Sequence, residues 1–436
     1  QQNWGALKQF YTENEDWRGY IQTLDDALVD VSDASQRVEI QCEIARVFET
    51  WLNDLDSAVQ RLEQVLDEAP ENLSVARTLE THYSAQDNRV KQVAVLQRIV
   101  DGTEVPQEAI DALEHGIVLL EADEHADEAF DWVCRLAELE LEQGRFEQAD
   151  RLDHLADQAE RYLDYSNWLG EVADVAPDQS LRRQILLRRG AILHDQLDQN
   201  QEAIQVYERL ASIHDADLEP LAILEKLTYQ EQDWTRFEQV LWRQIDIHRG
   251  NDEESSRDHL RSSYLKIAQL REDLFEDNAQ ASGCYQSVLD LCPGDRTSLD
   301  GLERIYRADE RWSDLINLLR EDMERVSDVS AANTRRLSIA SVINRQMDDV
   351  DSAIDEYTQV LADEPGRPEA LAALEDLFDA GRGQIRAGHL LEPVLRQTER
   401  YDRLVEILVN RLDTTGEPVE RSGLLEELSV IQEQFL

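Results

Sequence analysis

The sequence predicts an all-α protein built as an α-solenoid, in which helix hairpins stack on one another along the chain. Two patterns lead to this prediction. A phrase with helical spacing recurs about every 72 residues, and small and large apolar residues alternate between its copies. Composition agrees, because a 436-residue chain with 42% hydrophobic and 31% charged residues is typical of a folded protein rather than a disordered one. We expect about six such units.

The first recurring phrase runs from a leucine to an aromatic residue and on to a second leucine. In LERIYRADERWSDLINLLRED (302–322), Leu302 is followed ten residues later by Trp312, and Leu319 lies seven beyond that. Spacings of this kind place side chains on one helix face, so we expect the tryptophans to belong to the core. The copies open at Leu7, Leu79, Leu152, Leu224 and Leu302, and their second positions are Trp17, Arg89, Tyr162, Trp234 and Trp312.

The second phrase lies between copies of the first. A small residue is followed thirteen residues later by an alanine, and a large residue comes four after that. Small residues let two helices approach closely, and a proline ends the second helix in three copies. Each unit of about 72 residues therefore reads as four helices. The residues are Ala45, Gly116, Gly190, Ala268 and Ala340; Ala58, Ala129, Ala203, Ala281 and Ala353; Leu62, Val133, Tyr207, Tyr285 and Tyr357; and Pro70, Pro293 and Pro365.

No hairpin of this kind can bury its apolar stripe alone, so we expect residues 1–436 to form a single continuous array. Units should begin near residues 36, 107, 181, 258 and 331, with both chain ends inside a unit. We expect the chain to be an excerpt of a longer array, or its ends to be covered by partners. In the sixth unit we expect an irregular insertion at 379–390, which either changes the local superhelix geometry or forms a binding loop.

The order small residue, alanine, large residue and proline resembles the tetratricopeptide repeat. The resemblance is most specific at 58–70, 281–293 and 353–365 and looser in the Trp-centred halves. The alternation of two hairpin types is similar to that in long tetratricopeptide arrays of bacterial proteins. The resemblance implies a right-handed superhelix.

Charge restricts the partners. There are 93 acidic residues against 43 lysines and arginines, giving a net charge of −50, and only Lys8, Lys91, Lys226 and Lys266 are lysines. Such a surface repels nucleic acid and anionic membranes and attracts basic partners. It is also typical of halophilic or marine bacterial proteins, whose acidic coat is screened by salt. No stretch approaches the roughly 20 apolar residues of a membrane span. We expect a soluble protein of the cytoplasm or periplasm.

The sequence offers no candidate for catalysis, a cofactor or a metal. The glycine-rich segment 381–388 lacks the preceding strand and the GK[ST] ending of a phosphate loop. His248 and His259 flank the acidic segment 249–258, and we expect solvated histidines there rather than a zinc site. The basic segment 181–190 has two interpretations: salt bridges to neighbouring repeats, or a dock for an acidic peptide or phosphate. We expect a protein that is not an enzyme.

The resemblance also implies that the first helix of each hairpin lines a concave groove in which peptides bind. Some family members clamp a terminal carboxylate with Lys and Asn, and the matching positions here, such as Cys42 and Arg46, hold neither. The expected function is a non-catalytic scaffold that binds protein segments. The alternative is a structural subunit, or a segment of a large repeat protein, that assembles end to end. The predicted groove residues are Glu39, Glu43, Arg46, Arg188, His194, Lys266, Gln269, Asn344 and Arg345.

Overall fold

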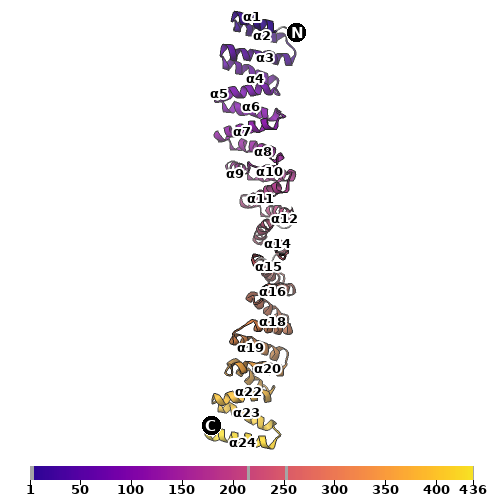
Figure 1. The fold of residues 1–436 in the computed structure, drawn as a ribbon, viewed down its shortest axis with the longest axis vertical. Coiled ribbons are helices and arrows are strands. Elements are labelled where there is room, and N and C mark those ends of the chain that lie inside the picture. The colour runs from indigo at the N-terminus through magenta and orange to yellow at the C-terminus, as the bar shows by residue number, and fades with distance from the viewer. Residues whose placement is uncertain (1–3, 214–216, 251–253, 436) are drawn as a thin grey trace. The chain divides into compact units, whose positions relative to one another are not determined.

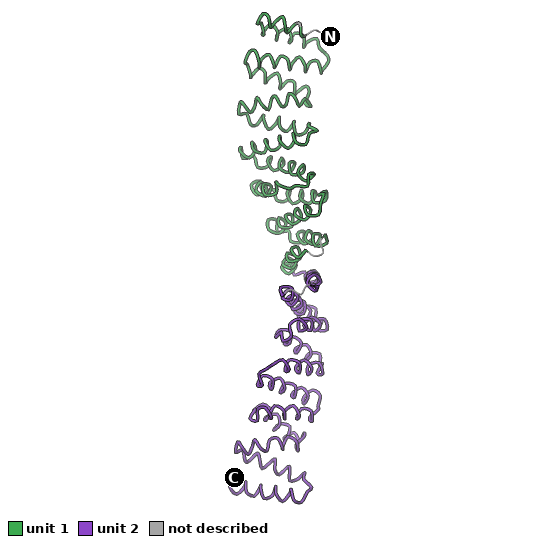
Figure 2. Tube along the Cα trace, viewed as in Figure 1, with its two compact units in different colours: residues 1–231 green, residues 232–436 purple. Residues whose placement is uncertain are grey.

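A computed structural model describes residues 4–213, 217–250 and 254–435, and all secondary structure in these ranges is helical. The prediction of an all-α solenoid is confirmed. Within each of the two units described next, antiparallel helices follow one another in chain order, each packed against the next (Figure 1). The chain divides into two compact units, residues 1–231 and 232–436 (Figure 2).

The first unit contains thirteen α-helices and one short π-helical turn in its described part. They are α1 (Trp4–Asn14), α2 (Trp17–Asp30), α3 (Ala34–Val47), η1 (Phe48–Leu52), α4 (Leu55–Glu68), α5 (Leu73–Ala85), α6 (Arg89–Gly102), α7 (Pro106–Ala122), α8 (Ala126–Glu142), α9 (Ala149–Gln158), α10 (Tyr162–Val175), α11 (Gln179–Asp195), α12 (Asn200–Ile213) and α13 (Leu218–Gln230).

The second unit contains eleven α-helices in its described part. They are α14 (Trp234–His248), α15 (Glu254–Asp273), α16 (Asn278–Leu291), α17 (Arg296–Ala308), α18 (Trp312–Arg325), α19 (Val329–Gln346), α20 (Val350–Asp363), α21 (Pro368–Asp379), α22 (Gln384–Gln397), α23 (Tyr401–Thr414) and α24 (Pro418–Gln434).

Short polar residues set where many helices begin. Asp54 precedes α4 and accepts a hydrogen bond from the backbone N–H of Ser57, and Asp295 does the same for Ser298 at α17. These caps satisfy backbone donors that have no partner inside the helix. At the other ends, α4, α16 and α20 stop just before Pro70, Pro293 and Pro365, as the sequence predicts.

Tight turns inside the hairpins use a left-handed residue that is seldom glycine. The turn between α7 and α8 has Glu124 at φ 58°, and the turn between α17 and α18 has Glu310 at φ 55°. A non-glycine residue costs about 1 kcal/mol or more in this region, so the turns carry local strain. The same conformation occurs at Glu15, Asn53, Asp87, Glu160, Asp198, Glu276 and Asp348.

The predicted pairing of small and large residues builds the core. The five phrase alanines are all buried, from Ala58 at 1% exposed to Ala353 at 0%. A Cβ at Gly116 would lie 2.0 Å from Trp132, and one at Gly190 would lie 2.5 Å from the ring of Tyr207. These glycines are therefore required for the close approach of α7 to α8 and of α11 to α12.

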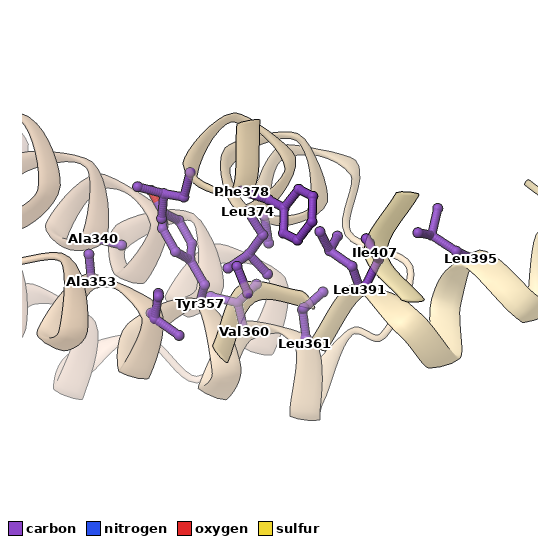
Figure 3. Packing of buried hydrophobic residues seen from close by; sticks show 14 of the residues in the cluster. Ala340, Ala353, Tyr357, Val360, Leu361, Leu374, Phe378, Leu391, Leu395 and Ile407 are labelled. Carbon is purple, nitrogen blue, oxygen red and sulfur yellow. The ribbon is translucent and has the colours of Figure 1, made fainter. Parts of the chain in front are cut away.

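In the second unit, successive helices interdigitate in one apolar cluster (Figure 3). Tyr357 of α20, Phe378 of α21, Leu391 of α22 and Ile407 of α23 all belong to it. Trp312 packs against this cluster while half-buried, and Trp234 packs in the same way against a second cluster. Trp234 and Trp312 thus pack against the core while remaining partly exposed.

Segment 379–390 comprises the end of α21, a four-residue turn and the first half of α22. Helix α22 begins ten residues after Leu374, which is the spacing from Leu302 to the start of α18, and α23 begins ten residues after Leu391, so this spacing occurs twice in succession. Helix α22 also has unusual features of its own. It has left-handed residues on both sides, Gly383 and Glu399, and contains a proline, Pro393.

Arginine side chains cross from one helix to another about 30 residues away. Arg37 pairs with Glu68 at 2.8 Å, and Arg151 pairs with Glu121 at 2.6 Å. In the second unit, Arg271 of α15 pairs at 2.6 Å with Glu238 of α14, whose side chain is only 9% exposed. A guanidinium can donate several hydrogen bonds in a fixed plane, which suits it to such bridges.

Candidate partner-binding pockets

The first pocket lies between α1 and α3, with α2 as its floor, and has a volume of about 520 Å³. Lys8 of α1 and Glu43 of α3 form an ion pair at 2.6 Å across it, and Arg46 also binds Glu43, at 3.0 Å. The floor residue Tyr20 is 1% exposed, and burial together with the charge of Glu43 raises its pKa to about 12. Tyr20 therefore remains a neutral hydroxyl at physiological pH. The full lining is Gly5, Lys8, Tyr20, Leu24, Val38, Glu39, Ile40, Cys42, Glu43, Arg46 and Asn72.

The second pocket repeats this arrangement between α9 and α11, with α10 below, in about 530 Å³. Arg188 of α11 pairs with Asp153 of α9 at 2.8 Å and with Asp150 at 2.9 Å. Burial raises the pKa of Asp153 although Arg188 acts in the opposite direction. One carboxylate oxygen of Asp153, Oδ1, is buried without a hydrogen-bond partner, which explains why burial prevails.

The third pocket belongs to the second unit and lies among α17, α18 and α19. It is smaller, about 140 Å³, and Arg296, Glu303, Asp322, Arg335 and Ser338 supply its charged and polar lining together with Thr334. Asp322 is 8% exposed and accepts a hydrogen bond from Arg335 at 2.9 Å.

All three pockets fall at the same place in the repeat, where a Trp-phrase hairpin meets the next small-residue helix. In two of the pockets, the residue that follows the opening leucine of the first phrase contacts a residue 35 positions later in the chain. That second residue lies two positions before the small residue of the second phrase. This pair is Lys8–Glu43 in the first pocket and Asp153–Arg188, with the charges exchanged, in the second. Comparing the repeated phrases with one another would have predicted these facing pairs, whereas the pattern within a single helix does not.

The predicted groove residues are only partly brought together. Glu39, Glu43 and Arg46 line the first pocket, and Arg188 lines the second. Outside the three pockets, His194 contacts Asn200 at 2.6 Å, and Asn344 has a buried, unpaired carbonyl oxygen. Exposed positions on α15 and α19 hold the remaining three, Lys266, Gln269 and Arg345.

Salt bridges account for two arginines of the basic segment 181–190. Arg183 binds Asp217 at 2.5 Å and also Glu219, while Arg188 binds the two aspartates of α9. Arg182 donates to the backbone oxygens of Ala173 and Ala176, both at 3.0 Å, at the end of α10. Arg183 and Arg188 thus form the salt bridges of the first interpretation, whereas Arg189 has a buried Nε without a hydrogen-bond partner.

The imidazole rings of His248 and His259 stack at 4.9 Å with 9° between their planes. Burial and the neighbouring His259 lower the pKa of His248. Residues 251–253 of the acidic segment between them lie outside the described residues. Within the described ranges, no three His, Cys, Asp or Glu side chains gather in a metal-binding arrangement. Likewise, none of the described helices combines the length and apolarity needed to cross a bilayer.

Comparison with known families decides the type of repeat. Residues 298–330, which contain α18 and all but the first two residues of α17, match the model of the tetratricopeptide repeat. This segment of the chain is a tetratricopeptide repeat. The match lies in a Trp-centred hairpin, not in the Ala-and-Pro half where the resemblance was expected to be most specific. Tetratricopeptide repeats generally serve as non-catalytic scaffolds for protein partners.

Solved tetratricopeptide proteins are similar to this chain. One from Parabacteroides merdae has 13% identity and a TM-score of 0.26, covering 65% of this chain and 98% of its own. The C-terminal part of a repeat protein from Cytophaga hutchinsonii has 11% identity and a TM-score of 0.26, covering 69% and 99%. The tetratricopeptide domain of P58(IPK) has 15% identity and a TM-score of 0.22, covering 91% and 98%. Curated protein sequences give no match.

Proposed function

We propose that this tetratricopeptide repeat protein is a non-catalytic scaffold that binds extended segments of basic proteins in the recurring pockets. The supporting observation is the repetition of one pocket at equivalent helix junctions, each lined by side chains of both charges. A peptide offers backbone donors and acceptors that such a mixed lining can satisfy. The net charge of −50 favours a cationic partner through long-range attraction.

The pockets allow a direct test. Ala191 lines the second pocket, so Ala191→Trp would fill it, whereas Gln205→Trp adds the same side chain at an exposed position of α12. We expect basic peptides to bind more tightly than neutral or acidic ones in calorimetry, and Ala191→Trp, but not Gln205→Trp, to weaken binding. Equal binding by both variants, or a preference for acidic peptides, would contradict the proposal.

The second candidate is self-association, because α24 exposes apolar side chains. Three apolar side chains of this helix are well exposed: Val419 is 84% exposed, Leu425 54% and Val430 48%. Val419 and Val430 are eleven residues apart and lie on one face of the helix, so a second copy packed on that face would bury both. Light scattering over a concentration and salt series tests this idea. A constant monomer mass, in the wild type and in a Val430→Glu variant alike, would exclude it. We also propose, from the recurring phrases, that residues 1–436 form a single continuous array.

A further inference from the structure

Trp51 is a large aromatic residue held at the tip of the α3–α4 hairpin. It lies in the π-helical turn η1, which Asn53 closes with φ 52°. Its ring stacks on Trp17 at 4.3 Å with 16° between the planes. Trp17 is 8% exposed but Trp51 is 50% exposed, so the stack has a buried half and a solvent-facing half. Single-turn π-helices of this kind are frequent at functional sites.

Other rings in the described part of the chain carry a cation of the chain itself. Arg161 lies 4.7 Å from the centre of the Phe130 ring, and Arg311 lies 4.6 Å from that of Tyr306. Phe275, Phe378 and Tyr83 are covered in the same way by Arg271, Arg403 and Lys91. Among the described residues, no lysine or arginine lies over Trp51.

The stacked tryptophans hold two acidic hairpin tips together. The segments around them, 13–18 and 48–56, contain six carboxylates and one guanidinium. Asp16 and Asp54 cap their helices, and the charge of Arg18 acts on Asp54, while Glu49 remains 43% exposed near His82. The local field therefore attracts cations toward an exposed indole face.

We propose that the solvent-facing side of Trp51 binds an arginine side chain of a basic partner, so that the partner supplies the cation that other rings receive from this chain. A planar guanidinium stacks on indole and leaves its N–H groups free for carboxylates, which favours arginine over lysine. The inference rests on the proposed function, because it assumes a basic partner. It names an anchor separate from the helix pockets.

The test uses labelled hexa-arginine and the full chain at low and moderate salt, about 50 and 300 mM. Trp51→Leu should weaken binding about fivefold and Trp51→Phe about twofold, since indole is the best ring for cation–π contact. Tyr229→Leu, at another half-exposed aromatic in the same unit, should bind as the wild type does. Hexalysine should be less sensitive to Trp51→Leu.

A second measurement does not depend on variant stability. In the wild type, the indole N–H resonance that is missing in Trp51→Phe should shift on adding hexa-arginine. If the wild type binds hexa-arginine but Trp51→Leu binds equally well and that resonance stays in place, the anchor is overturned while the scaffold stands. If the wild type does not bind hexa-arginine even at low salt, the proposal of a basic partner fails as well.

Discussion

Gly116 provides a sharp test of the close packing between α7 and α8. An added Cβ would lie 2.0 Å from Cζ3 of Trp132 and 2.6 Å from Cε3, whereas carbon atoms in contact are about 3.5–4.0 Å apart. Trp132 is 6% exposed, so its ring would have to move about 1.5 Å within the core. Overpacking of this kind costs about 1–3 kcal/mol, and alanine recovers about 1 kcal/mol of helix propensity. We therefore expect Gly116→Ala to lower the free energy of unfolding by up to about 2 kcal/mol.

Gly283 is the matched control, because it lies inside α16 and a Cβ there meets nothing within 4 Å. Gly283→Ala should raise stability by about 0.5–1 kcal/mol. Hydrogen exchange resolved to single helices, together with urea unfolding, suits a stacked array whose segments open separately. A double variant with Trp132→Leu should recover part of the loss. If Gly116→Ala stabilised the protein as Gly283→Ala does, the packing argument would be refuted.

Three further expectations follow from turns, charges and a proline. Glu124→Gly should raise the free energy of unfolding by about 1 kcal/mol, because glycine adopts the left-handed conformation without strain. Glu114→Gly, inside α7, should lower it by about 1 kcal/mol. The urea midpoint should therefore rise in the first variant and fall in the second. The hydrogen bond from Arg304 lowers the pKa of Glu272 in the folded protein. The ionised Glu272 therefore stabilises the fold above its unfolded pKa of about 4.3, and this stabilisation is lost as the pH falls through its folded pKa. Between neutral and acid pH, the free energy of unfolding should therefore fall less in Glu272→Gln than in the wild type. Pro393→Ala should stabilise α22 by about 1–3 kcal/mol, seen as slower hydrogen exchange in that helix; unchanged exchange would contradict this.

Spacing along the chain was sufficient to predict the helices and their buried faces. The phrase alanines, such as Ala203 and Ala281, lie at 0% exposure because a helical period determines which side chains share a face. Helix ends were equally predictable at Pro70 and Pro293, since proline cannot continue a helix.

Pairwise contacts across the pockets were not predictable from single helices. Arg188 was assigned to the groove, but its two aspartate partners on α9 depend on side-chain reach between elements 35 and 38 residues apart. With 93 acidic residues, many partners satisfy the sequence equally well, and packing selects among them. The stack of Trp51 on Trp17 was missed for the same reason.

The short turns with left-handed acidic residues have a practical consequence. Each turn joins two helices that are also packed against the helices before and after them. A peptide grafted at Glu124 or Glu160 would therefore lie between two helices and interrupt neither of them. Grafts at successive turns of the first unit would project from a common edge at intervals set by helix packing. The array could thus display several epitopes in a defined order.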